Sequence, residues 1–256
     1  MNEWIRRSIE LAKQRDYLDR LSQIYAIPHE LRRPIDRETR HQILKLFESR
    51  DAVGLIRLLM GLKKFPFQDP YIGSLRVDEG AITRNPQTVE RIARILYTMG
   101  PDKIIEGLEE PPQPNRQLGA LFKRWLRTSQ YPFFSEEDFV GADGISFLRG
   151  SNGKLKEFVD RILCCQLEKR PDFVAKTPRG YIVGEAKFIT TGGGNQDKSF
   201  REVVRFLHEE KGGAIRVGLL DGVVWLTDTG LYATIREVEK PAMTALLLND
   251  FLQAPP

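Results

Sequence analysis

The segment Pro171–Lys187, PDFVAKTPRGYIVGEAK, constrains the fold of this chain more than any other stretch. The four residues from Thr177 to Gly180 have the composition of a tight turn, because proline fixes φ and glycine accepts a positive φ. The residues on either side predict two short strands that the turn joins. The segment therefore predicts a β-hairpin, and a hairpin decides which residues lie side by side.

Three ionisable residues stand at the ends of these two strands. Asp172 opens the first strand, while Glu185 and Lys187 close the second. Because side chains alternate along a strand, Glu185 and Lys187 point the same way and Ala186 points the other way. The sequence therefore predicts that two carboxylates and one ammonium converge on one spot.

Such a group of charges has a specific chemical use. Two carboxylates can hold Mg²⁺, which prefers oxygen ligands and makes a bound water more acidic. A nearby lysine can orient that water and stabilise charge on a phosphate. The alternative is a surface hairpin whose ends happen to be charged. We favour the functional interpretation because the Pro-Asp start, the turn and the apolar run Tyr181–Val183 all agree.

Pro171-Asp172, followed after a hairpin by Glu185-Ala186-Lys187, resembles the PD-(D/E)xK nuclease superfamily, and within it the type II restriction endonucleases. The resemblance covers residues 150–226, and its motif is short. It implies a restriction-endonuclease-like α/β (α+β) fold, a mixed central sheet flanked by helices. It also implies that Asp172 and Glu185 are Mg²⁺ ligands together with the backbone carbonyl of Ala186, and that Lys187 assists the attacking water.

The stretch Lys154–Leu167 has the apolar spacing of a helix with one buried face. The resemblance implies that an acidic residue on this helix faces the metal, with Glu157 as first candidate and Asp160 as second. The alternative is that both are solvated helix charges. Cys164 and Cys165, adjacent on the same expected helix, are interpreted as two buried thiols.

A glycine-rich loop, Gly192–Gly194, follows Lys187 and leads into an expected helix over Phe200–Glu210. Glycines let a backbone approach a ligand closely, amides can read base edges, and cations can hold phosphates. The alternative is a mobile surface loop that Asn195 or Asp197 caps. The residues that we predict to contact DNA here are Asn195, Gln196, Lys198 and Arg201.

Further along, Ala214–Leu220 and Val223–Leu226 are apolar runs separated by Asp221-Gly222, a strong turn dipeptide. They predict two buried strands that extend the sheet. The apolar segment near the C-terminus predicts a closing helix that ends before Pro255.

The segment Pro114–Gln130 carries four cations and no acid, with Trp125 among them. A basic helix with an aromatic side chain suits a phosphate backbone, so Lys123 and Arg124 are predicted to contact DNA phosphates. The alternative is that the apolar residues pack inward while the cations are merely solvated, and both descriptions can hold at once.

Residues 1–130 read as mainly helical, and Pro86–Met99 is the clearest case, with proline in the first turn, Gly100 at its end and Asn85 as a candidate cap. The Pro-rich stretch 107–116 is the best linker candidate. We therefore expect a helical region, 1–130, for DNA recognition or dimerisation and a catalytic region, 131–256.

Composition sets limits on the class of protein. The chain has 256 residues, 41% of them hydrophobic and 29% charged, as in soluble globular proteins. We expect no membrane association, because no apolar run has spanning length, and a cytoplasmic location, because the N-terminus is unlike a signal peptide. A net charge of +4 permits nucleic-acid binding.

Taken together, these features predict a Mg²⁺-dependent type II restriction endonuclease. It would cut double-stranded DNA at a specific sequence and leave 5′-phosphates. The resemblance implies a homodimer, and a cognate DNA methyltransferase would be its genetic partner. The alternatives are a repair or structure-specific nuclease of the same superfamily, and a non-catalytic DNA-binding protein that keeps the fold.

Overall fold

The computed structural model of the protein describes residues 1–27, 34–78, 80–110, 114–209, 211–226 and 230–255, without the side chains of 114–116. The chain forms two compact units. The first, the sheet unit, combines Met1–Ile27 with Gln113–Pro256, and the second, the helical unit, is Pro28–Pro112. The helical unit is therefore an insertion, in sequence, between two segments that fold together.

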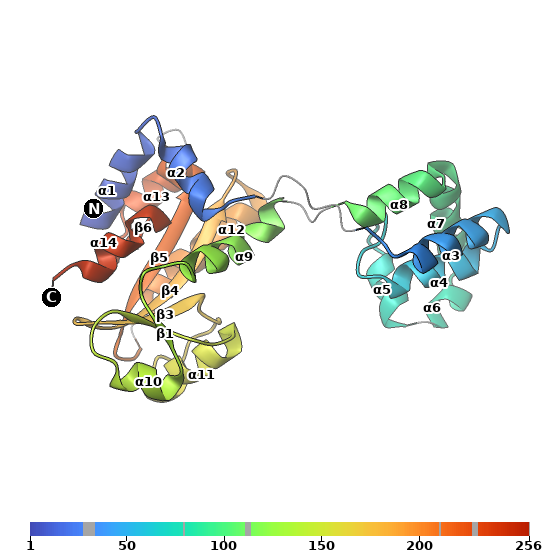
Figure 1. The fold of residues 1–256 in the computed structure, drawn as a ribbon. Coiled ribbons are helices and arrows are strands. Elements are labelled where there is room, and N and C mark those ends of the chain that lie inside the picture. The colour runs from blue at the N-terminus through green and yellow to red at the C-terminus, as the bar shows by residue number, and fades with distance from the viewer. Residues whose placement is uncertain (28–33, 79, 111–113, 210, 227–229, 256) are drawn as a thin grey trace. The chain divides into compact units, whose positions relative to one another are not determined.

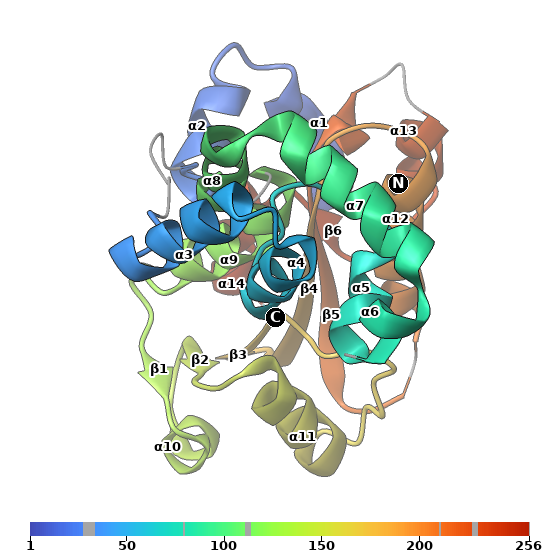
Figure 2. The same ribbon diagram turned by 90° about the vertical axis from the view of Figure 1, so that its right-hand side faces the viewer.

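A mixed six-stranded sheet organises the sheet unit, with the strands in their sequence order (Figure 1). The pairs β2–β3 and β3–β4 are antiparallel, while β1–β2, β4–β5 and β5–β6 are parallel. The long neighbours β4 and β5 run side by side through its centre (Figure 2). The strands are β1 (Phe133–Phe134), β2 (Ser146–Leu148), β3 (Phe173–Thr177), β4 (Gly180–Ile189), β5 (Ala214–Gly222) and β6 (Ala242–Met243).

Helices flank this sheet and surround its buried core. In chain order they are α1 (Glu3–Ala12), α2 (Tyr17–Ile24), α9 (Pro114–Leu126), α10 (Glu136–Gly141), α11 (Asn152–Ile162), α12 (Gly194–His208), the 3-10 helix η1 (Val223–Trp225), α13 (Gly230–Arg236), the 3-10 helix η2 (Ala245–Leu247) and α14 (Leu248–Gln253). This is the mixed α/β fold, flanked by helices, that the sequence predicted.

Two glycines at the centre of the sheet make room for neighbouring side chains, one on helix α12 and one on strand β3. A Cβ atom at Gly218 would lie 2.7 Å from Cγ1 of Val203 on α12, and one at Gly184 would lie 2.0 Å from the ring of Phe173. The register pairs Gly218 with Glu185. Glu185 therefore lies on the face that α12 covers, next to the point where that helix comes closest to the sheet.

The predicted hairpin is present, with Thr177 paired to Gly180 across the turn and Phe173 paired to Gly184. The preceding helix, α11, ends at Ile162, five residues before the predicted end at Leu167. Cys164 and Gln166 follow it with positive φ values of 54° and 49°. The cysteines consequently lie beyond the helix, and Cys164 is exposed, so only the burial of Cys165 was predicted correctly.

The prediction of a turn at Asp221-Gly222 is wrong. Strand β5 continues through both residues, and Val223–Trp225 forms a 3-10 helix in place of a strand. The reason is a buried carboxylate: Asp221 accepts hydrogen bonds from the hydroxyls of Tyr25 and Thr244 and from the amide of Ala245. Burial raises the pKa of Asp221 to about 6. These donors replace the solvent that a turn aspartate would need.

The helical unit has a core of its own, which includes Ile43, Leu55 and Ile92. Its longest helix, α7, is labelled in Figure 2 and spans the predicted residues. Its buried side chains recur with helical spacing. Asn85 does not cap it, because its side-chain amide donates to the carbonyl of Ala81 instead. The helices are α3 (Arg37–Glu48), α4 (Ala52–Gly61), α5 (Ile72–Val77), α6 (Gly80–Arg84), α7 (Pro86–Met99) and α8 (Pro101–Glu109).

The compact units differ from the expected division at residue 130. Helices α1, α2 and α9 lie in the sheet unit, because their apolar faces join its core. Helix α8 occupies the start of the expected linker 107–116, and residues 111–113 of that linker lie outside the described residues. The described helices do confirm that the N-terminal half is mainly helical.

Replacing Gly218 with alanine is expected to destabilise the sheet unit by about 1–3 kcal/mol, since the added Cβ overpacks the contact with Val203. All three tryptophans lie in the sheet unit, so their fluorescence during urea unfolding reports on this unit. Gly213→Ala is the matched control, because a Cβ there meets no atom within 4 Å. Equal midpoints for both variants would contradict the close approach of α12.

Candidate active site

Asp172 is fixed to the backbone of β4 at the point where β3 begins. Its amide donates to the carbonyl of Gly184 at 2.9 Å, and its Oδ2 accepts the amide of Ala186 at 3.0 Å. The first bond extends the antiparallel pairing by one residue. The second holds the Asp172 carboxylate against Ala186, the residue between Glu185 and Lys187. The hairpin thus brings the first predicted carboxylate to the predicted place.

Glu185 and Lys187 point to the same side of β4, as their spacing predicted. The Nζ atom of Lys187 lies 2.7 Å from Oε1 of Glu185, and the side chains are 31% and 7% exposed, respectively. The ion pair is therefore shielded from water on its carboxylate side and open on its ammonium side.

Burial and the nearby charges change the pKa values of Glu185 and Lys187. Burial raises the pKa of Glu185 above its ordinary value, and the charge of Asp172 adds to the increase. Burial alone would lower the pKa of Lys187, yet the charges of Glu185 and Asp172 outweigh it and raise that pKa. The site consequently holds negative charge in a poorly hydrated place, which favours the approach of a cation.

Each carboxylate here has a lysine as its partner. Lys123 of α9 lies 3.1 Å from Oδ1 of Asp172. Beside the Glu185–Lys187 pair, Lys169 forms an ion pair with Glu202 of α12. The charge of Glu202 contributes to the raised pKa of Lys187. Sequence reasoning missed Lys169 and Glu202; the only signal was the position of Glu202 between the buried Phe200 and Val203.

The donor set fits a hard divalent cation. Strand β3 ends its pairing with β4 at Gly184, so no strand of the described residues lies along that edge of β4 beyond Gly184. The amide of Ala186 faces this edge, because it binds Asp172. In a strand the carbonyl of a residue points to the same edge as its amide. Two carboxylates and the Ala186 carbonyl would give Mg²⁺ an oxygen-only set with room for waters.

The structure does not bring Glu157 to this pair. It lies on the exposed side of α11, and its charge is not among the influences on the pKa of Glu185. Asp160 instead accepts the amide of Leu167 and pairs with Lys156. Among the described residues, no three His, Cys, Asp or Glu side chains form a cluster that could hold a metal.

The glycine-rich loop leads directly into α12, which begins at Gly194, earlier than predicted. Asn195 and Lys198 are exposed on its first turns, and Arg201 follows one turn later. Gln196 has a structural contact, since its Oε1 accepts the amide of Thr190 at 3.3 Å. The side-chain nitrogen of Gln196 is by its chemistry a hydrogen-bond donor. In the loop before the helix, the backbone amide of Gly193 donates to the carboxylate of Asp197.

Helix α9 presents cations on one side and apolar residues on the other. Arg124 is exposed, whereas Lys123 is half-buried beside Asp172. A groove of about 660 Å³ opens between α9 and the start of α11, and its lining includes Lys123, Arg127, Arg149 and Asp172. The groove therefore joins a basic rim to one of the two candidate metal ligands.

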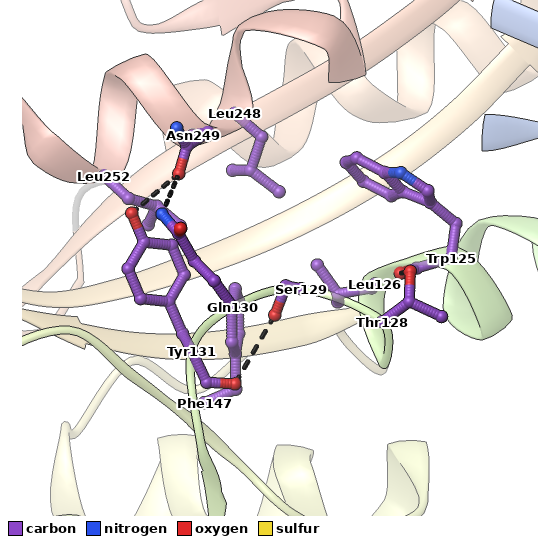
Figure 3. Close-up of a pocket in the computed structure, with 10 residues that line it drawn as sticks. All are labelled: Trp125, Leu126, Thr128, Ser129, Gln130, Tyr131, Phe147, Leu248, Asn249 and Leu252. Carbon is purple, nitrogen blue, oxygen red and sulfur yellow. Dashed lines mark hydrogen bonds between the residues drawn. The ribbon is translucent and has the colours of Figure 1, made fainter. Parts of the chain in front are cut away.

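Trp125 turns away from that groove. It lines a separate pocket of about 240 Å³ with Tyr131 and Leu248, where the Tyr131 hydroxyl donates to Asn249 at 2.6 Å (Figure 3). The aromatic residue of the basic helix thus packs against the protein, while Arg124 is exposed and Lys123 pairs with Asp172. The apolar residues of this helix pack inward, as one of the two descriptions expected, while contact of its cations with DNA stays a prediction.

The fold and the paired carboxylates at the end of its hairpin are those of a restriction-endonuclease-like protein. The chain belongs to the Tsp45I family of type II restriction enzymes, whose family model matches residues 2–254. Comparison with curated proteins gave no match, and comparison with solved structures gave none either. The protein is therefore a site-specific endodeoxyribonuclease that binds DNA, which excludes the non-catalytic alternative and favours restriction over repair.

None of the helices within the described ranges is long and apolar enough to cross a membrane.

Replacing Glu185 with glutamine is expected to lower the pKa of Lys187, because the largest charge that opposes the effect of burial is then removed. The ammonium would lose its proton at a lower pH than in the parent protein. The measurement is the ¹³C NMR shift of the Lys187 Cε atom during a pH titration. Lys13, which follows α1 and is far from Lys187 in the sequence, is the internal control, and an unchanged Lys187 titration would contradict the ion pair.

Proposed function

We propose that the protein hydrolyses DNA phosphodiesters with Mg²⁺ held by Asp172, Glu185 and the carbonyl of Ala186, and leaves 5′-phosphate ends. Type II restriction enzymes generally use divalent metal ions, and the family supplies the endonuclease activity. The observation that carries the proposal is the convergence of Asp172, Glu185 and Lys187 at one end of the hairpin. Glu157 is not needed in this set.

The cation would polarise the scissile phosphate and acidify a water. Lys187 is the side chain that orients this water, because its ammonium is held by Glu185 and is partly open to solvent. In the transition state the same ammonium stabilises the added charge on the phosphate oxygens. Asp172 and Glu185 are fixed before the substrate arrives, so little reorganisation is required.

Recognition needs further groups around this centre. We propose that Asn195, Gln196, Lys198 and Arg201 contact DNA from the start of α12, where exposed amides and cations stand on the helix that covers Glu185. Lys123 and Arg124 would contact phosphates from α9. The helical unit, Pro28–Pro112, would contribute to recognition or to dimerisation.

A homodimer would place one active site on each strand of a duplex, which is why we propose this assembly for a double-strand cut. The enzyme would act in the cytoplasm, with a cognate DNA methyltransferase that protects the host DNA. These proposals rest on the family and on the candidate site formed by Asp172, Glu185 and Lys187.

Cleavage is expected to be abolished in each of three variants, Asp172→Ala, Glu185→Ala and Lys187→Ala. For Lys187→Ala the cleavage rate should fall by about a hundredfold to ten-thousandfold. DNA binding should persist, because phosphate contacts elsewhere supply affinity. The measurement is mapping of cut ends on a DNA of known sequence, with a gel-shift assay for binding. Lys13→Ala, which changes an exposed lysine directly after α1, is the control. A Lys187→Ala enzyme that cuts at the parental rate would refute the assignment.

Exchange of the metal gives an independent prediction. Mg²⁺ or Mn²⁺ should support turnover at an oxygen-only site, whereas the larger Ca²⁺ should support DNA binding without efficient cleavage. The measurement is the cleavage rate after removal of metal with EDTA and addition of each ion. Full activity in excess EDTA would exclude the mechanism.

A further inference from the structure

The ammonium of Lys123 lies where it would compete with a metal ion for the carboxylate of Asp172. Its Nζ atom lies 3.1 Å from Oδ1 of Asp172 and 2.8 Å from Oδ1 of Asn152, at the start of α11. The other oxygen of Asp172 already accepts the amide of Ala186. Lys123 therefore holds the carboxylate oxygen that the described backbone contact leaves open.

This arrangement opposes metal binding. An ammonium 3.1 Å from Asp172 would stand within a few ångströms of a divalent cation bound to the same carboxylate. Two positive charges at such a separation repel each other strongly where water is scarce. The Asp172 side chain is 15% exposed, so solvent screens this repulsion poorly.

A second partner is within the reach of the same lysine. Lys123 lines the groove of about 660 Å³ together with Arg127 and Arg149, whose cations suit a phosphate. A lysine side chain has a flexible four-carbon stem and can redirect its ammonium. A DNA phosphate in the groove can thus draw Lys123 away from Asp172.

We propose that Lys123 is a latch, a positioning residue that exchanges Asp172 for a DNA phosphate and so makes the binding of DNA and of a divalent cation mutually dependent. The proposal rests on the proposed metal site. Without DNA, Lys123 satisfies Asp172 and keeps cation affinity low. With DNA, the carboxylate is released, and by thermodynamic reciprocity the cation strengthens DNA binding by the same factor.

The test is calorimetric titration with Ca²⁺, the ion expected not to support efficient cleavage. Without DNA, Lys123→Met should bind Ca²⁺ about tenfold more tightly than the parent protein, whereas a purely structural lysine predicts weaker binding. Arg124→Met is the matched control, because it removes one cation from the exposed side of the same helix. It should bind Ca²⁺ as the parent protein does.

The second arm adds a saturating DNA duplex that contains the mapped cleavage site. DNA should tighten Ca²⁺ binding to the parent protein about tenfold and to Lys123→Met by much less. Asn152→Ala keeps the lysine and removes one of its two partners. It should bind Ca²⁺ with an affinity between those of the parent protein and Lys123→Met.

The outcomes separate this inference from the proposed function. If Asp172→Ala abolishes Ca²⁺ binding but Lys123→Met binds no more tightly than Arg124→Met, the latch is refuted and the metal site stands. Equal gains from DNA in the parent protein and Lys123→Met would also refute it. If the parent protein binds no Ca²⁺ with or without DNA, the metal site itself is refuted. Circular dichroism checks that each variant folds.

Discussion

The two backbone-mediated bonds of Asp172 are the contacts on which the site depends. They fasten the residue before β3 to Gly184 and Ala186 at 2.9 and 3.0 Å, at the only part of β4 where β3 no longer pairs. A carboxylate that is held by a backbone amide needs no side-chain partner to stay in place. The position of the negative charge is consequently set by the sheet, and the side chains around it adapt to that charge.

A buried carboxylate on β5 supports the same end of the sheet, since Asp221 pairs with Phe188, the residue after Lys187. Asp221 closes β5 and binds Tyr25 of the segment after α2 and Thr244 after β6. These partners lie 196 and 23 positions away in the chain. A charged group without water is stable only with such donors. The network therefore makes the position of β5, and with it the position of its neighbour β4, depend on the N-terminal helices.

Local chemistry predicted the parts of the structure that local chemistry decides. The hairpin followed from a proline and a glycine in one turn, and α7 followed from its first-turn proline and its apolar spacing. Asp221-Gly222 has the composition of a turn, but distant donors kept it in a strand. Lys123 lies in a basic segment that predicted DNA contact, yet its ion-pair partner is Asp172, 49 positions further along the chain. Contacts between residues far apart in the sequence, such as these two, cannot be predicted from the spacing of neighbouring residues.

The sheet unit is made of two segments that the chain produces far apart in time. Ser8 of α1 accepts the amide of Thr244, and the side chain of Asn2 donates to the carbonyl of Glu239. The helical unit is continuous and has its own core, so it can fold while synthesis proceeds. The cutting unit must wait for residues near 244. A ribosome-bound chain that has not reached them carries a finished helical unit and an unfinished nuclease, so host DNA is not exposed to an active site before these residues have been made.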